Sequence, residues 1–135
     1  MVQQEDVLIA HVFTAAGVFA VDTEDGVVLG EPREPAAPVP ADVTLPRLVA
    51  AAASGATVVA VVDRRPPLLV SHDAGATWRE AGRGLPPGFA VAVHPDDPDR
   101  VLYAGRSRLY LSTDGARFWR SLELELPDVE AVAWA

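Results

Sequence analysis

Five arginines are the residues of this 135-residue chain whose type and placement could most directly do chemistry. Arg64, Arg65, Arg83, Arg106 and Arg108 lie in short polar segments between apolar runs. A guanidinium group holds several donors in a fixed fork and binds carboxylate or phosphate bidentately. The five arginines are therefore candidates for binding an anionic ligand or an acidic peptide. The alternative is that they are solvated loop residues paired with nearby carboxylates.

Histidines and aspartates are weaker candidates for a metal site. The spacing of His11, His72 and His94 does not form a ligand set. The segment 96–99 carries three carboxylates, which are the hard oxygen ligands that Ca²⁺ prefers. Prolines accompany these carboxylates, so a polar turn is the simpler interpretation. The sequence predicts neither a metal nor a cofactor.

An internal repeat indicates the elements that position these residues. Ser-His-Asp-Ala-Gly-Ala-Thr-Trp at 71–78 is followed by Ser-Thr-Asp-Gly-Ala-Arg-Phe-Trp at 112–119, with the two serines 41 residues apart. Both copies follow an apolar run. The Asp side chain can accept hydrogen bonds from backbone N–H groups of the turn, and Gly can adopt a positive φ at little cost. A period of about 40 residues is typical of stacked units such as propeller blades.

The first copy resembles the Asp-box (BNR) repeat of sialidase-like and sortilin-like β-propellers, Ser-x-Asp-x-Gly-x-Thr-Trp, at every position. In the second copy glycine comes one place early, and Ala and Phe hold the Gly and Thr positions. The resemblance implies an all-β propeller of four-stranded antiparallel blades. It also implies that the box residues are structural and not catalytic. These residues are Ser71, Asp73, Gly75, Thr77, Trp78, Ser112, Asp114 and Trp119.

Read as repeats, residues 1–135 form one domain of three units, at about 7–32, 48–82 and 89–127. The expected strands of the last two units are 48–53, 58–62, 68–71, 78–81, 89–94, 101–105, 109–112 and 119–126. Leucine and glutamate alternate in the last strand, which is typical of a strand with one solvated face. The proline-rich segment 31–40 is expected to be an extended link between units, with a peptide-like docking arm as the alternative.

The first unit lacks a first strand. Its expected parts are a second strand at 7–10, a third strand at 18–21 and a weakened box at 22–29. A surplus strand at 130–135 aligns with 89–94, the first strand of the third unit. Six residues follow 89–94 before its second strand, and six would separate Ala135 from Val7 if the two chain ends were joined. The C-terminal strand is therefore expected to complete a first unit.

Three units do not close a ring, because propellers typically have four to eight blades. An open arc also exposes strand edges that invite association. The prediction is a homodimer that forms one six-bladed ring by strand exchange, in which each C-terminal strand completes the partner's first unit. A nine-bladed trimer and a fragment of a longer protein are the alternatives.

The expected ligand site is the axial mouth opposite the box turns, where the arginine-bearing loops lie. The strands that would line the channel, 48–53, 89–94 and 131–135, contain no Asp or Glu. Glycosidases generally need two carboxyl groups that flank the scissile bond. We therefore expect a non-enzymatic binding or scaffold module for a protein, a glycan or a small anion, without catalytic residues. The alternative is a glycoside hydrolase of the sialidase-like class.

The formal net charge of −8 argues against bulk binding to nucleic acid or an anionic membrane. The chain has no cysteine, which excludes disulfides and thiolate metal sites. The first six residues lack the features of a signal peptide, and the apolar run 48–53 is too short to span a membrane. A cytoplasmic location is expected.

Overall fold

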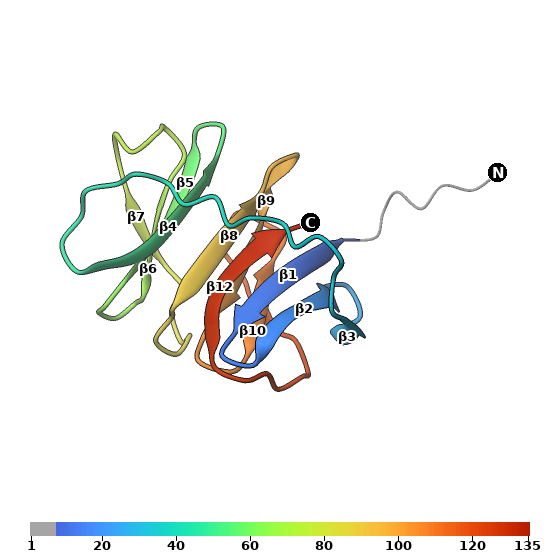
Figure 1. The fold of residues 1–135 in the computed structure, drawn as a ribbon. Helices are drawn as coiled ribbons and strands as arrows, with labels where there is room; N and C mark the ends of the chain where they lie inside the picture. The colour runs from blue at the N-terminus through green and yellow to red at the C-terminus, as the bar shows by residue number, and fades with distance from the viewer. Residues whose placement is uncertain (1–7) are drawn as a thin grey trace.

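The computed structural model describes residues 8–135, which form three four-stranded antiparallel sheets (Figure 1). The strands are β1 (Ile9–Thr14), β2 (Gly17–Asp22), β3 (Val27–Gly30), β4 (Leu48–Ser54), β5 (Thr57–Val62), β6 (Leu68–Ser71), β7 (Arg79–Ala81), β8 (Ala90–His94), β9 (Asp97–Ala104), β10 (Leu109–Ser112), β11 (Arg120–Ser121) and β12 (Val129–Trp134). The first sheet has the order β12-β1-β2-β3, the second β4-β5-β6-β7 and the third β8-β9-β10-β11. The predicted all-β architecture of four-stranded antiparallel units is confirmed. No helix within residues 8–135 is long and apolar enough to cross a membrane.

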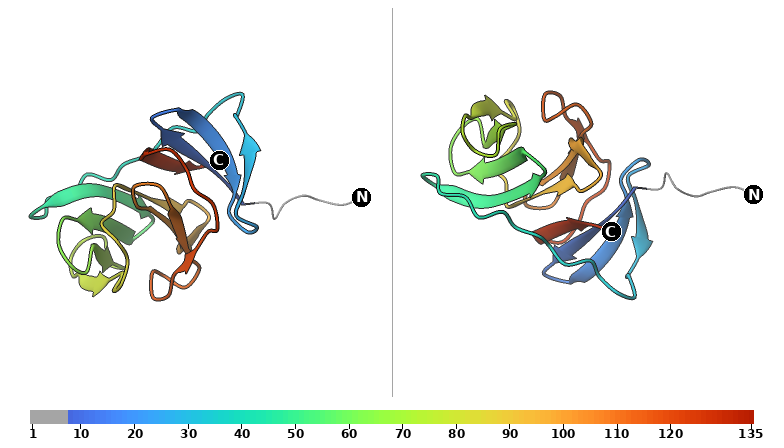
Figure 2. Two further views of the ribbon diagram at one scale, coloured as in Figure 1. Left: turned by 90° about the horizontal axis from the view of Figure 1, so that it is seen from below. Right: turned by 90° about the horizontal axis from the view of Figure 1, so that it is seen from above.

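The C-terminal strand completes the first sheet of its own chain. β12 pairs antiparallel with β1, and Val12 lies opposite Val132. The predicted exchange, in which a partner chain donates this strand, stays a prediction. The segment 31–47 carries the chain from β3 back to β4 across the open side of the arc (Figure 2).

The third sheet lies between the other two and buries both of its faces. On β8, Ala90 and Ala92 belong to the apolar cluster shared with the first sheet. Val91 and Val93 belong to the cluster shared with the second sheet. Successive side chains of a strand point to opposite faces, so one strand supplies both interfaces. The sheets therefore follow one another in the spatial order second, third, first.

The first sheet departs from the register that the repeat predicted. The expected strand at 7–10 begins at Val7, which lies outside the described residues, and the observed strand is β1. Four residues from Ala10 to Phe13 pair with β12, as Val101 to Ala104 pair with β8. The β1–β2 hairpin extends as far as Thr14 opposite Gly17.

The fourth strand of the third sheet is much shorter than the predicted strand at 119–126. β11 pairs with β10, and Leu122 N donates to Leu109 O at 2.9 Å just beyond it. The backbone then turns, since Leu124 N donates to Leu122 O at 2.8 Å. Leu122 and Leu126 are nevertheless buried, while the two glutamates between them are exposed. The alternation of leucine and glutamate therefore predicted burial correctly and the strand wrongly.

The first repeat turn, 71–78, is closed by its own side chains. Ser71 Oγ donates to Asp73 Oδ1 at 2.7 Å and accepts from Gly75 N at 2.8 Å. Asp73 accepts from Thr77 N at 2.8 Å and from Thr77 Oγ1 at 2.6 Å. These bonds join the end of β6 to the start of β7 and fix the hairpin.

The second repeat turn, 112–119, keeps this geometry despite its different sequence. Ser112 Oγ accepts from Ala116 N at 3.0 Å, and Asp114 Oδ1 accepts from Phe118 N at 3.0 Å. Gly115 and Ala116 both have positive φ, 76° and 73°, as Ala74 and Gly75 have in the first turn. Alanine rarely adopts this left-handed conformation, so the side-chain hydrogen bonds hold the backbone there.

The hydrogen bonds of the first turn predict an acid-labile contribution to stability. They lower the pKa of Asp73 from 3.8 to about 2, chiefly through the hydroxyl and the backbone N–H of Thr77 and then through Ser71. Because the folded state binds this proton less tightly than the unfolded state, the contribution is complete above the unfolded pKa and is lost as pH falls from 3.8 towards 2. We expect the urea midpoint to fall over this range, and to fall less in Asp73→Asn. Urea unfolding at several pH values measures this, and an unchanged pH dependence in Asp73→Asn would contradict it.

Candidate functional site

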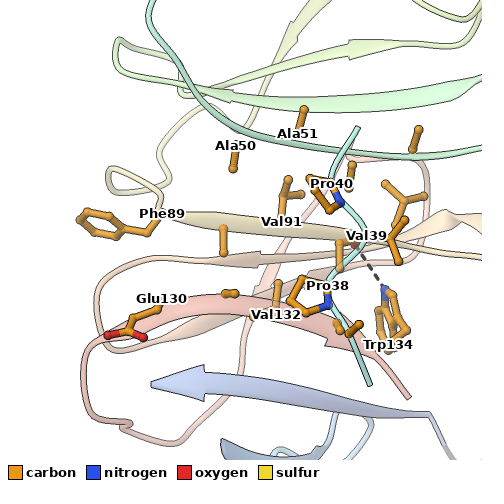
Figure 3. Close-up of a pocket in the computed structure, with 18 of the residues that line it drawn as sticks. Pro38, Val39, Pro40, Ala50, Ala51, Phe89, Val91, Glu130, Val132 and Trp134 are labelled. Carbon is orange, nitrogen blue, oxygen red and sulfur yellow. Dashed lines mark hydrogen bonds between the residues drawn. The ribbon is translucent and has the colours of Figure 1, made fainter. Parts of the chain in front are cut away.

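The inner strands β4, β8 and β12 line an apolar groove with a volume of about 400 Å³ (Figure 3). β8 contacts both β4 and β12. The segment 37–40, which is Ala-Pro-Val-Pro, lies across these strands and forms part of the groove wall. Val39 is 78% exposed and Phe89 43% exposed, so the groove has an apolar rim.

Trp134 closes one end of this groove, while Phe89 and Glu130 lie at the other end (Figure 3). The indole Nε1 of Trp134 donates to Ala92 O at 3.3 Å. Its ring lies 5.1 Å from the ring of His94 in an edge-on arrangement. Trp134 packs between the first and third sheets. Because it is only 9% exposed, it offers little surface to a ligand.

Among the described residues, Glu130 is the one charged side chain that lines the groove. General acid–base hydrolysis of a glycosidic bond needs two carboxyl groups on either side of the bond. Within residues 8–135 the groove of one chain therefore does not supply the pair. No three His, Cys, Asp or Glu side chains in this part of the chain come together as a possible metal site.

Arg65 and Arg83 are brought together by the structure. They line one depression of about 470 Å³, together with Leu85 and four prolines. Arg65 comes from the β5–β6 loop and Arg83 from the link between β7 and β8. Both side chains are exposed, and neither forms an ion pair with a residue in the described range 8–135. This arrangement leaves their guanidinium donors available to an anion.

Arg64 lies in the same loop but has a partner. Its guanidinium is 3.6 Å from Glu80, and both side chains are about half exposed. Such a solvated pair contributes little, roughly 0–1 kcal/mol. Arg64 and Arg65 also line an adjoining depression of about 500 Å³, whose wall includes Asp63. The interpretation as ion-paired loop residues therefore describes Arg64 better than Arg65.

Arg106 and Arg108 lie apart from this depression, in the β9–β10 loop of the third sheet. Arg108 is 3.2 Å from Glu125, and the backbone carbonyl of Arg106 accepts from Val129 N at 2.8 Å. Neither side chain lines the depression of Arg65 and Arg83. The repeat pattern placed all five arginines at one mouth, but it could not place loops of different sheets relative to one another.

The sequence interpretation of 31–40 as a link was too simple, because this segment covers the inner strands. Its backbone is attached through Ala36 N, which donates to His11 Nδ1 at 2.8 Å. Ala41 N then donates to Ala51 O at 2.9 Å, so the chain runs beside β4. The sequence feature that could have indicated this contact with the inner strands is the run from Ala37 to Pro40, which has no polar side chain.

Comparison with known proteins gives one relationship at the level of structure. No family model and no curated protein matches the chain. The chain is similar to the solved structure of a GH74 enzyme from Niastella koreensis, with a TM-score of 0.51 and 25% sequence identity. The match covers 90% of this chain and 18% of that enzyme. That neighbour has a β-propeller-type fold.

The fold is of the β-propeller type. The three sheets are consistent with three blades, so that the first, second and third sheets are the first, second and third blades. This chain spans less than a fifth of the length of the enzyme that it matches, so the similarity carries the architecture and not an activity.

Proposed function

We propose that this chain is a non-catalytic β-propeller module of the Asp-box type that binds an anionic, carboxylate-bearing ligand at Arg65 and Arg83. The observation that carries the proposal is the shared depression of these two arginines, without an ion-pair partner in residues 8–135. The self-closed repeat turns support the assignment to the Asp-box type. These turns lie at the opposite end of the blades from the loops of Arg65 and Arg83.

The surroundings of the two arginines favour recognition of a group with a fixed shape. Pro66, Pro67, Pro86 and Pro87 form the wall, and proline restricts the backbone of both loops. The carbonyl of Pro86 is further held by the hydroxyl of Tyr103, at 2.5 Å. A rigid wall reduces the entropy lost on binding. Two guanidinium groups can then engage a carboxylate or an acidic peptide by paired hydrogen bonds.

Binding of hexaglutamate, measured by calorimetry at low salt, tests this function. We expect Arg65→Gln and Arg83→Gln each to weaken binding by about tenfold or more, because each loses a charge-assisted contact. Arg117→Gln is the matched control, since Arg117 is an exposed arginine in the second repeat turn at the other end of its blade. Equal affinity in all four proteins, or no binding by the unaltered chain, would contradict the proposal.

The second candidate is a glycoside hydrolase function. The similarity to a GH74 enzyme favours it, and Glu130 in the inner groove would be the carboxylate to examine first. The single carboxylate argues against it. Turnover of a fluorogenic glycoside by the unaltered chain, lost in Glu130→Gln, would overturn the non-catalytic assignment. Our expectation is no turnover above background.

A further inference from the structure

The segment 31–47 is unusual among the connections of this fold. It has 17 residues, whereas the connections 82–89 and 122–128 have eight and seven. The two shorter connections join blades that are neighbours in space. The long connection runs from β3 along the open side of the arc to β4 (Figure 2). Its additional length is therefore used to cross from one end of the arc to the other.

This crossing segment is attached by few contacts. Ala36 N donates to His11 Nδ1 near its start, Ala41 N to Ala51 O in its middle, and Arg47 O accepts from Asp63 N at 2.9 Å near its end. A single hydrogen bond contributes a net 0.5–1.5 kcal/mol, roughly. These hydrogen bonds hold the segment weakly compared with the apolar clusters that join the blades. The segment can therefore leave the inner strands without unfolding a blade.

β12, the strand that completes the first blade, can likewise change its partner without unfolding a blade. β12 enters through the link 122–128 from the third blade and pairs with β1 in one register over residues 10–13, with a shift before Thr14. Trp134 and Val132 lie on β12, so their contacts with the third blade do not depend on which chain supplies β1. The strand would keep both sets of contacts if its β1 partner came from a second copy. Exchange of an identical element is a low-cost route to a dimer for this reason.

The two ends of the arc are the outer faces of the first and second blades. Their apolar side chains favour the exchange. Ala10 and Val12 face the third blade, so their neighbours Ile9 and Phe13 point to the outer face of the first blade. Both are only half-buried. At the other end of the arc, Val49 on β4 is 45% exposed. Release of the crossing segment would let these two apolar ends meet as neighbouring blades.

We propose that residues 31–47 are the hinge of a strand exchange by which two copies of this chain form a six-bladed ring. In the ring, each β12 pairs with the partner's β1, and the hinge joins first and second blades that are neighbours. Six blades lie within the range of closed propellers. The described structure is the single-chain form, in which β12 pairs with β1 of the same chain.

Shortening the hinge tests the proposal directly. Deletion of 33–41 leaves eight residues, the length of the connection 82–89, which no longer suffices for the crossing. The pair Val12→Cys and Val132→Cys reports the source of the strand, because the two positions are opposite one another and the chain has no other cysteine. We expect the shortened protein to have twice the mass of its own 126-residue chain by light scattering, where the full chain of 135 residues has a mass of 14.3 kDa. On oxidation, we expect disulfide-linked dimers on a non-reducing denaturing gel.

The full-length chain with the same two cysteines is the matched control. After refolding from urea at low protein concentration we expect an intrachain disulfide, and at high concentration a growing fraction of linked dimer. The proposal is overturned if neither protein forms an interchain disulfide at any concentration, and this outcome counts even if the shortened chain does not fold.

Discussion

Trp134→Ala is expected to lower the free energy of unfolding by about 3–5 kcal/mol, the usual cost of removing a buried indole. The side chain is 9% exposed and packs between the first and third blades. The substitution also leaves the carbonyl of Ala92 without its donor. Because Trp134 lies on β12, the effect measures how much of the fold depends on this strand.

Urea unfolding measures this effect, and Phe118→Ala is the control. Phe118 is another large side chain, but it is 78% exposed, so its removal should change stability by no more than about 0.5 kcal/mol. If Trp134→Ala and Phe118→Ala destabilise the protein equally, β12 is not packed between the blades as described.

Gly88→Ala is expected to lower the free energy of unfolding by about 1–3 kcal/mol, as overpacking of a core does. A Cβ at Gly88 would overlap the ring of Tyr103. That ring is fully buried, and its hydroxyl is held by Pro86 O. Burial also raises the pKa of Tyr103 above its usual range, so the hydroxyl stays protonated as a donor. Neither partner has room to move.

Gly105→Ala is the matched control for this substitution. Gly105 is also buried and lies in the same part of the third blade, but a Cβ there would meet its nearest neighbour, Pro86, at 3.5 Å. Thermal unfolding of both variants compares them. A Gly105→Ala variant at least as unstable as Gly88→Ala would mean that the contact with Tyr103 does not limit the packing.

The sequence predicted those parts of the fold that depend on local chemistry. The turns at 71–78 and 112–119 are closed by bonds within eight residues, and the alternating strands around them follow from period-two burial. The shortened β11 shows the limit, because burial of Leu122 and Leu126 does not require a ladder.

The parts that the sequence could not predict depend on contacts between distant residues. The donor to His11 is Ala36, 25 residues away in the chain, and no local pattern pairs them. The separation of Arg65 and Arg83 from Arg106 and Arg108 depends on how two blades pack. A repeat places residues within a unit, but it does not show which units pack against one another.

The pairing of β12 with β1 is the central claim, and interstrand nuclear Overhauser contacts in solution test it most directly. We predict contacts from Ala10 to Trp134 and from Phe13 to Ala131, the two ends of the part of the register that has no shift. We also predict that those amides of β12 that donate to β1 exchange as slowly as the amides of β5, whose side chains are all buried. These results are expected whether the strand comes from the same chain or from a second copy. Fast exchange throughout 129–134, without contacts to β1, would contradict the account.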